Sequence, residues 1–110
     1  MAYDEMLADR VRAAITALDG NVTERKMFGG LAFMLNGHMF AGVVGQDLML
    51  RLGEPAASHA LSRPHVREMD FTGRPMKGMI FVEPDGRNGP ALRQWVAEAA
   101  AFARSLPAKA

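Results

Sequence analysis

The side chains that could catalyse a reaction or hold a metal are few, and their spacing matches no common site. The 110 residues include no cysteine, which excludes disulfides, thiolate catalysis and cysteine-based zinc sites. The three histidines, His38, His59 and His65, form neither an HxH nor an HxxxH pair. We expect them to be exposed or to cap other elements, and we predict neither a metal nor a cofactor.

Carboxylates, serines and glycines add no stronger indication of catalysis. Glu68 and Asp70 share one face of a predicted strand, and a solvated strand face explains such a pair more simply than acid–base chemistry. No serine lies in the strand–turn–helix setting of a hydrolase nucleophile. The glycines of residues 27–30 and 72–78 lack the spacing of phosphate-binding or dinucleotide-binding loops. We therefore predict that the chain is not an enzyme.

Basic side chains gather near a predicted hairpin and could contact an acidic partner. Arg67 and Lys77 lie towards this hairpin, and Arg74 lies at its tip. Such a group can bind phosphates or an acidic protein surface. However, Glu68 and Asp70 interleave with them, and the formal net charge is only +1. Nucleic-acid binding through Arg67, Arg74 and Lys77 therefore stays an alternative that we do not favour.

Length and composition describe one folded domain. Hydrophobic residues make up 49% of the chain and charged residues 23%, which suits a globular protein with an ordinary core. We expect a single domain over residues 1–110, with its core from about residue 3 to residue 107. There is no leader-like start and no apolar run near the ~20 residues of a membrane helix. We expect a cytoplasmic, bacterial protein with no membrane partner.

Hydrophobic spacing predicts the element order α-β-β-β-α-β-β-α. Apolar residues recur every three or four positions over 3–18 and 90–107, which predicts a helix near each end. Asn36-Gly37 is the favoured two-residue hairpin turn, and residues 22–30 are either a short extended piece or a loop. We predict a two-layer α+β fold with a five-stranded antiparallel sheet. The elements between the two helices are a three-stranded meander over 31–52, a short helix from about 55 to 62, and strands over 66–71 and 76–82.

Both faces of the predicted meander are apolar, so each needs a covering layer. Leu31, Phe33 and Leu35 share the face that we assign to the core. The second face is too apolar to be simply solvated, so either a helix of this chain or another subunit covers it. Because a twofold dimer is the commonest way to cover such a face, we predict a homodimer or another protein partner. The predicted interface residues are Met34, Met39, Ala41, Val43 and Met49.

An ordered set of motifs resembles the N-terminal domain of the TfoX/Sxy competence regulators. The resemblance runs over residues 3–107 and includes the Asn36-Gly37 hairpin and the closing helix. It implies an antiparallel sheet backed by helices, similar to secretion-chaperone-like folds, and a stand-alone member without the second domain of the founding regulators. It supplies no catalytic residues. Its other motifs are Arg25-Lys26-Met27-Phe28-Gly29-Gly30 and Thr72-Gly73-Arg74-Pro75-Met76-Lys77-Gly78.

Three functions remain open at this point. The leading hypothesis is a non-enzymatic regulatory or protein-interaction domain, and the first alternative is weak nucleic-acid binding through the second hairpin. The second alternative is a small-ligand site, or an unrecognised enzyme, in a cleft lined by Met27, Phe28 and Phe33. That alternative predicts a closed apolar pocket with converging polar groups.

Overall fold

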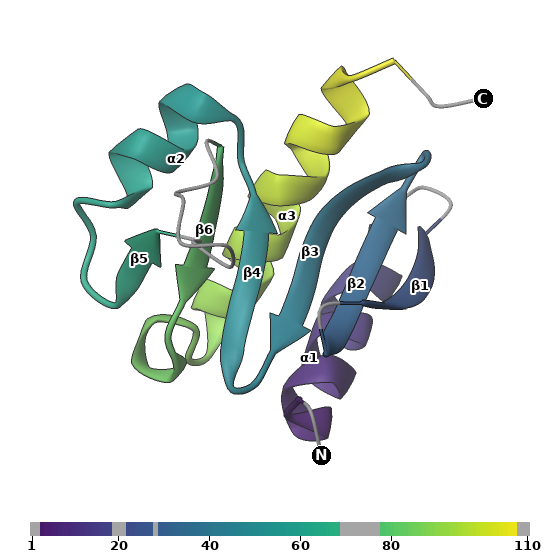
Figure 1. The fold of residues 1–110 in the computed structure, drawn as a ribbon, viewed down its shortest axis with the longest axis horizontal. Helices are drawn as coiled ribbons and strands as arrows, with labels where there is room; N and C mark the ends of the chain where they lie inside the picture. Colours follow the sequence, from purple (N-terminus) through teal and green to yellow (C-terminus); the bar gives the residue numbers. More distant parts are fainter. Residues whose placement is uncertain (1–2, 19–21, 28, 69–77, 108–110) are drawn as a thin grey trace.

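A computed structural model describes residues 3–18, 22–27, 29–68 and 78–107 as an α+β fold (Figure 1). The predicted fold class is therefore confirmed, and the helices and strands follow each other nearly as the sequence indicated. In chain order they are α1 (Glu5–Thr16), β1 (Val22–Met27), β2 (Gly30–Leu35), β3 (His38–Val44), β4 (Asp47–Arg51), α2 (Glu54–Ala60), β5 (Val66–Glu68), β6 (Met79–Val82), the 3-10 turn η1 (Pro84–Gly86) and α3 (Pro90–Ser105).

The antiparallel sheet has six strands, in the order β1-β2-β3-β4-β6-β5. The prediction of five strands is wrong because β1 pairs with β2 along its whole length, from Val22 opposite Leu35 to Met27 opposite Gly30. The strand was hard to recognise because an edge strand tolerates consecutive charged residues, here Glu24, Arg25 and Lys26.

The turns and caps that bound these elements follow from local sequence. Asn36 and Gly37 have φ of 54° and 84°, as a primed hairpin turn between β2 and β3 requires. Asp4 caps α1, because one of its carboxylate oxygens accepts from the backbone N–H groups of Met6 at 2.9 Å and Leu7 at 3.2 Å. The second predicted hairpin joins β5 to β6, but its tip, residues 69–77, lies outside the described residues.

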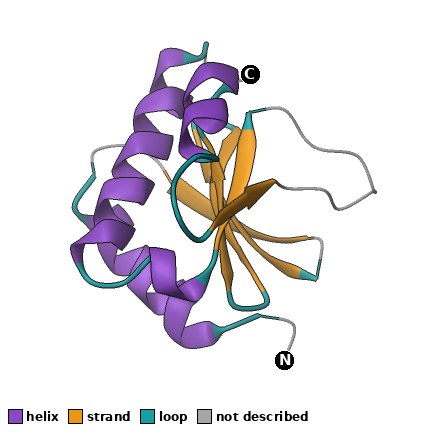
Figure 2. Cartoon of the chain, turned by 90° about the vertical axis from the view of Figure 1, so that its left-hand side faces the viewer, coloured by secondary structure: helices purple, strands orange, loops and turns teal. Residues whose placement is uncertain are grey.

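The helices lie together on one side of the sheet (Figure 2). The large hydrophobic core fills the space between them, with Phe33, Leu48 and Leu50 from the strands facing Leu7 of α1 and Trp95 of α3. None of the described helices is both long enough and apolar enough to cross a membrane.

A β-bulge in β3 decides which residues face this core. Phe33 pairs with Ala41 but Met34 pairs with Met39, so Phe40 has no partner of its own across the ladder. Phe40 and Ala41 are both fully buried in the core on the helix side. The bulge therefore shifts the alternation of β3 by one residue, which a strictly alternating pattern cannot predict.

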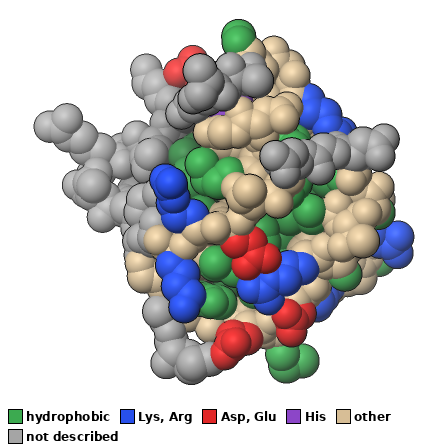
Figure 3. Space-filling model, turned by 90° about the vertical axis from the view of Figure 1, so that its right-hand side faces the viewer, with side chains coloured by type: hydrophobic (Ala, Val, Ile, Leu, Met, Phe, Trp, Pro, Cys, Tyr) green, Lys and Arg blue, Asp and Glu red, His purple; other side chains and the backbone are tan. Residues whose placement is uncertain are grey.

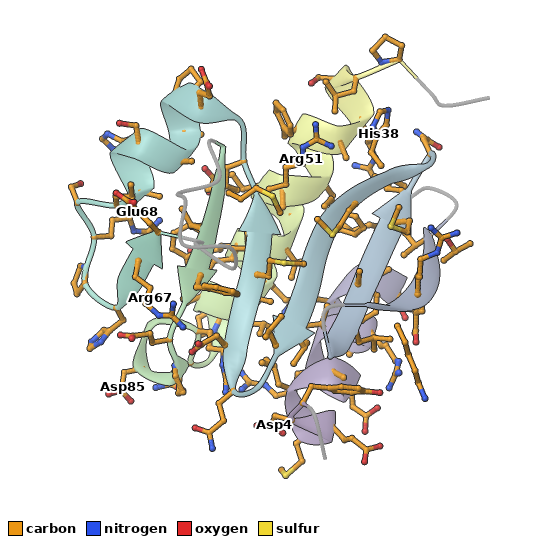
Figure 4. All side chains as sticks on the ribbon, viewed as in Figure 1. Asp4, His38, Arg51, Arg67, Glu68 and Asp85 are labelled. Atoms are coloured by element: carbon orange, nitrogen blue, oxygen red, sulfur yellow. The ribbon has the colours of Figure 1, made fainter. Side chains whose placement is uncertain are left out.

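Two buried polar side chains tie distant segments together. His38 was expected to be exposed or capping, yet it is only 8% exposed, and its Nε2 lies 2.6 Å from the carbonyl oxygen of Pro107 after α3. Figure 4 shows His38 beside the end of that helix. Arg87 is 7% exposed and donates to the carbonyl oxygen of Gln46 from Nε at 3.3 Å and Nη2 at 3.1 Å.

Candidate interaction face of the sheet

The face of the sheet opposite the helices, here called the outer face, holds a second and smaller apolar cluster. Met49, Met79 and Phe81 form its buried centre, and Met39 and Val44 pack against them while staying partly exposed. Figure 4 shows sulfur atoms lying over the strands on this side. Since all three described helices lie on the other side, none of them covers this cluster.

One ladder row crosses the whole outer face and sets its shape. Its order from edge to edge follows the strand pairing: Arg25, Ala32, Gly42, Met49, Phe81 and Arg67. An arginine therefore stands at each edge of the sheet, with small residues near β1 and large apolar residues near β5. The outer face is thus apolar in the middle and charged at both rims.

Gly42 leaves room for a methionine at the centre of this row. A Cβ atom at Gly42 would lie 2.5 Å from Cε of Met49 and 2.8 Å from the carbonyl oxygen of Leu31. Because no side chain projects there, Met49 lies over the backbone of β3 and is only 1% exposed. The glycine is therefore explained by close packing, not by an unusual backbone angle.

The rim near β5 carries a compensated charge cluster. The Arg67 guanidinium contacts Asp47 through Nη2 and approaches Glu83 Oε2 at 3.5 Å from Nε. It also stacks over the ring of Phe81, 4.5 Å from the ring centroid. Figure 4 labels Arg67 at this edge. Two carboxylates therefore share one guanidinium at this rim.

The rim near β1 carries one exposed arginine on the outer face. Arg25 is exposed on the outer face and forms no ion pair with any residue in the described part of the chain. Its neighbour Glu24 points to the helix side, where both of its oxygens accept from Arg12, at 2.7 Å and 2.9 Å. This hydrogen bond holds the pKa of Glu24 below its usual value. Figure 3 views this side of the molecule, where acidic and basic side chains lie next to each other.

The predicted interface set divides between the two faces. Met34, Met39 and Met49 lie on the outer face. Ala41 and Val43 instead belong to the main core and are fully buried against the helix layer. Placing all five on one face was wrong, because the bulge at Phe40 turns the following residues over.

The predicted basic set is only partly described. Arg67 lies on the outer face, where Asp47 and Glu83 compensate its charge. Arg74 and Lys77 lie outside the described residues, as do Thr72, Gly73 and Pro75 of the second motif. Nothing described brings three basic side chains together at this hairpin.

The first motif is explained by strand geometry. Arg25 and Lys26 are exposed on β1, while Gly29 has a φ of +70° in the turn that follows. Gly30 begins β2, where an added Cβ would lie 2.3 Å from the carbonyl oxygen of Val43, so no side chain fits. Phe28 and the side chain of Met27 lie outside what is described.

The other predicted chemistry finds little geometry to support it. Phe33 is 1% exposed and faces the helix layer, so it does not line an open cleft with Met27 and Phe28. Across residues 3–18, 22–27, 29–68 and 78–107, no three histidine or acidic side chains are placed to share a metal ion.

Val44, Met79 and Phe81 also belong to the outer face, although the predicted interface set does not include them. Met79 and Phe81 alternate with Ile80 and Val82 in a strand that was itself predicted, so the signal was present. What was missing was the position of β6 between β4 and β5, which brings these two residues beside Met49.

Comparison with known proteins now identifies the family. The model of the TfoX N-terminal domain matches residues 12–103, which is most of the chain. The chain belongs to the TfoX N-terminal domain family. No curated protein and no solved structure matches it. The family indicates a regulatory domain of the competence-regulator type and names no specific role for this TfoX N-terminal domain.

Proposed function

We propose that this TfoX N-terminal domain is a non-enzymatic regulatory domain that acts by binding protein, and that its partner is a second copy of the chain on the outer face. The observation that carries the proposal is the group of partly exposed apolar side chains, Met34, Met39 and Val44, around a buried centre that no described helix covers. Methionine suits such a surface because its flexible side chain adapts to a partner.

The charges of the two rims support a second copy as the partner. The β1 rim carries Arg25, which forms no ion pair with the residues that the structure describes, and the β5 rim carries Asp47 and Glu83 around Arg67. A twofold axis parallel to the strands, between two outer faces, places the β1 rim of each copy against the β5 rim of the other. Opposite charges then meet twice, as an isologous interface requires.

Molar mass in solution tests the self-association directly. Light scattering coupled to size exclusion over a concentration series should give a mass that rises towards twice the 12.0 kDa of one chain. A mass that stays at one chain up to the highest concentration overturns the homodimer. In that case the outer face is left to a different protein.

Matched variants test whether the outer face is the interface. Met39→Glu should abolish the dimer, because it places a charge among the partly exposed apolar side chains around the buried centre. Met6→Glu is the control, since Met6 is 78% exposed on α1, away from the outer face. Equal masses for the two variants would contradict the assignment of the interface.

A charge exchange tests the orientation of the two copies. Arg25→Glu should weaken the dimer because it faces the acidic rim of the partner, and adding Glu83→Lys to the same chain should restore it. Failure of the double variant to recover the dimer would exclude the proposed axis.

Salt-sensitive retention of the wild type on immobilised DNA or RNA would instead favour the nucleic-acid alternative.

A further inference from the structure

A groove runs between α1 and α3 on the helix side of the molecule, away from the outer face. Its volume is about 330 Å³, which lies at the lower end of the range for small-molecule sites. Apolar residues line much of it, including Ala13 of α1, Ala17 just after α1 and Leu92 of α3. Ala13 and Ala17 are four positions apart, so they lie on the same side of the helical turn, and their small side chains leave the groove open.

Two arginines from different helices line this groove. Arg10 comes from α1 and Arg93 from α3, and no acidic residue is among those that line the groove. Arg10 is held in place because its Nη2 donates to the carbonyl oxygen of Arg87 at 3.3 Å. Arg93 is exposed and makes no ion pair with the described residues. The lining therefore combines two basic residues with alanines and a leucine.

A third arginine, Arg87, lies next to Arg10. Burial lowers the pKa of Arg87, and the nearby charge of Arg10 lowers it further. Asp4 and Asp47 act in the opposite direction. Asp4 is 3.9 Å from Arg87 through one oxygen, while its other oxygen already caps α1.

We propose that this groove binds a small organic phosphate monoester. Two arginines that line one groove favour an anion that can accept from both, and the three free oxygens of a monoester do so better than the two of a carboxylate. The groove exceeds the size of a phosphate alone, and the alanines and Leu92 accommodate a short apolar part of the ligand. This site is independent of the proposed outer-face dimer.

Phenyl phosphate is a suitable probe, because it combines the anion with a compact apolar group. Titrated into the isotope-labelled chain, it should produce saturable NMR shifts at the amides of Ala13, Ala17 and Leu92. Benzoate has the same ring on a carboxylate and should bind more weakly. Benzoate binding as tightly as phenyl phosphate would overturn the choice of phosphate, and the absence of saturable shifts would overturn the site.

A double variant tests whether Arg10 and Arg93 bind the phosphate directly or whether any loss of positive charge weakens binding. Arg10→Gln with Arg93→Gln should weaken binding by at least about tenfold, because two charge-assisted contacts are lost. Lys26→Gln removes an exposed positive charge outside both the groove and the proposed dimer interface, and it should leave the affinity unchanged. Equal affinities for the double variant and this control would refute the role of the two arginines.

A third variant blocks the groove without changing any charge. Ala13→Leu places a larger side chain in the groove. The position is exposed and helical, so it tolerates leucine. It should abolish the shifts while circular dichroism and thermal unfolding stay as in the wild type. Undiminished binding would show that the probe lies elsewhere. The monomeric Met39→Glu variant should bind like the wild type, so the two proposals fail separately.

Discussion

The two faces of the sheet differ more in what covers them than in how hydrophobic they are. The helix side has phenylalanine, leucine, isoleucine and valine packed against two long helices, whereas the outer face has methionines and Phe81 beside small residues and charged rims. Branched and aromatic side chains fill a fixed volume in few conformations, while methionine adapts to a variable one. The contrast indicates that one face holds the fold together and that the other is suited to a partner.

Neighbouring residues on opposite faces provide a direct test of whether the two faces contribute differently to stability. The largest difference is expected in β2, where Phe33 is 1% exposed in the core and Met34 is partly exposed on the outer face. Phe33→Ala should cost about 3–5 kcal/mol of unfolding free energy, because it leaves a cavity. Met34→Ala should cost about 1 kcal/mol or less. Urea unfolding of the monomer measures both, and equal costs would remove the distinction between the faces.

The two glycines at the start of β2 should also respond differently. Gly30→Ala should cost about 3 kcal/mol, because the new methyl group would collide with the backbone of β3. Gly29→Ala should cost about 1 kcal/mol, since its positive φ is unfavourable for alanine although the space around it is open. Thermal unfolding can rank the two, and a larger loss for Gly29→Ala would contradict the packing of β2 against β3.

Val43 and Val44 lie on opposite faces of β3, and a valine-to-threonine change at each position keeps the shape of the side chain while adding a hydroxyl group. Val43→Thr buries a hydroxyl in the core and should cost about 1–2 kcal/mol. Val44→Thr lies on the partly exposed outer face and should change stability by about 0.5 kcal/mol or less. Chemical unfolding of each single variant provides the measurement. A greater loss of unfolding free energy in Val44→Thr than in Val43→Thr would contradict the position of the bulge and the assignment of the two faces.

The smallest expected effect is at Glu24 and Arg25, and it depends on pH. Glu24→Gln should cost about 0.5 kcal/mol at neutral pH, because the ion pair with Arg12 is partly exposed. The folded pKa of Glu24 is lowered, so its contribution is complete above the unfolded value of about 4.3 and is lost as pH falls through the lower folded value. Arg25→Gln should show no such loss. Stability curves from about pH 7 to pH 2 test both, and a pH-independent difference at Glu24 would exclude this explanation.

Local sequence was sufficient for much of the fold. The periodic apolar residues of α1 and α3 and the Asn36-Gly37 turn specify their structures through contacts within a few residues. The edge strand β1 escaped prediction, because an edge position with one neighbour imposes little alternation on its side chains. The same lack of constraint hid the difference between Glu24, which faces the helices, and Arg25, which faces outward.

The α+β class, the family motifs and the absence of cysteine chemistry can be inferred from the sequence alone, since each depends on residue type and short-range spacing. Only the tertiary structure decided which residues share a face. The bulge at Phe40 reversed the expected sides of Ala41 and Val43, and the insertion of β6 beside β4 assembled the outer cluster. The groove between α1 and α3 likewise joins Arg10 and Arg93 across the fold. Such contacts depend on strand order and helix packing, which short-range spacing does not encode.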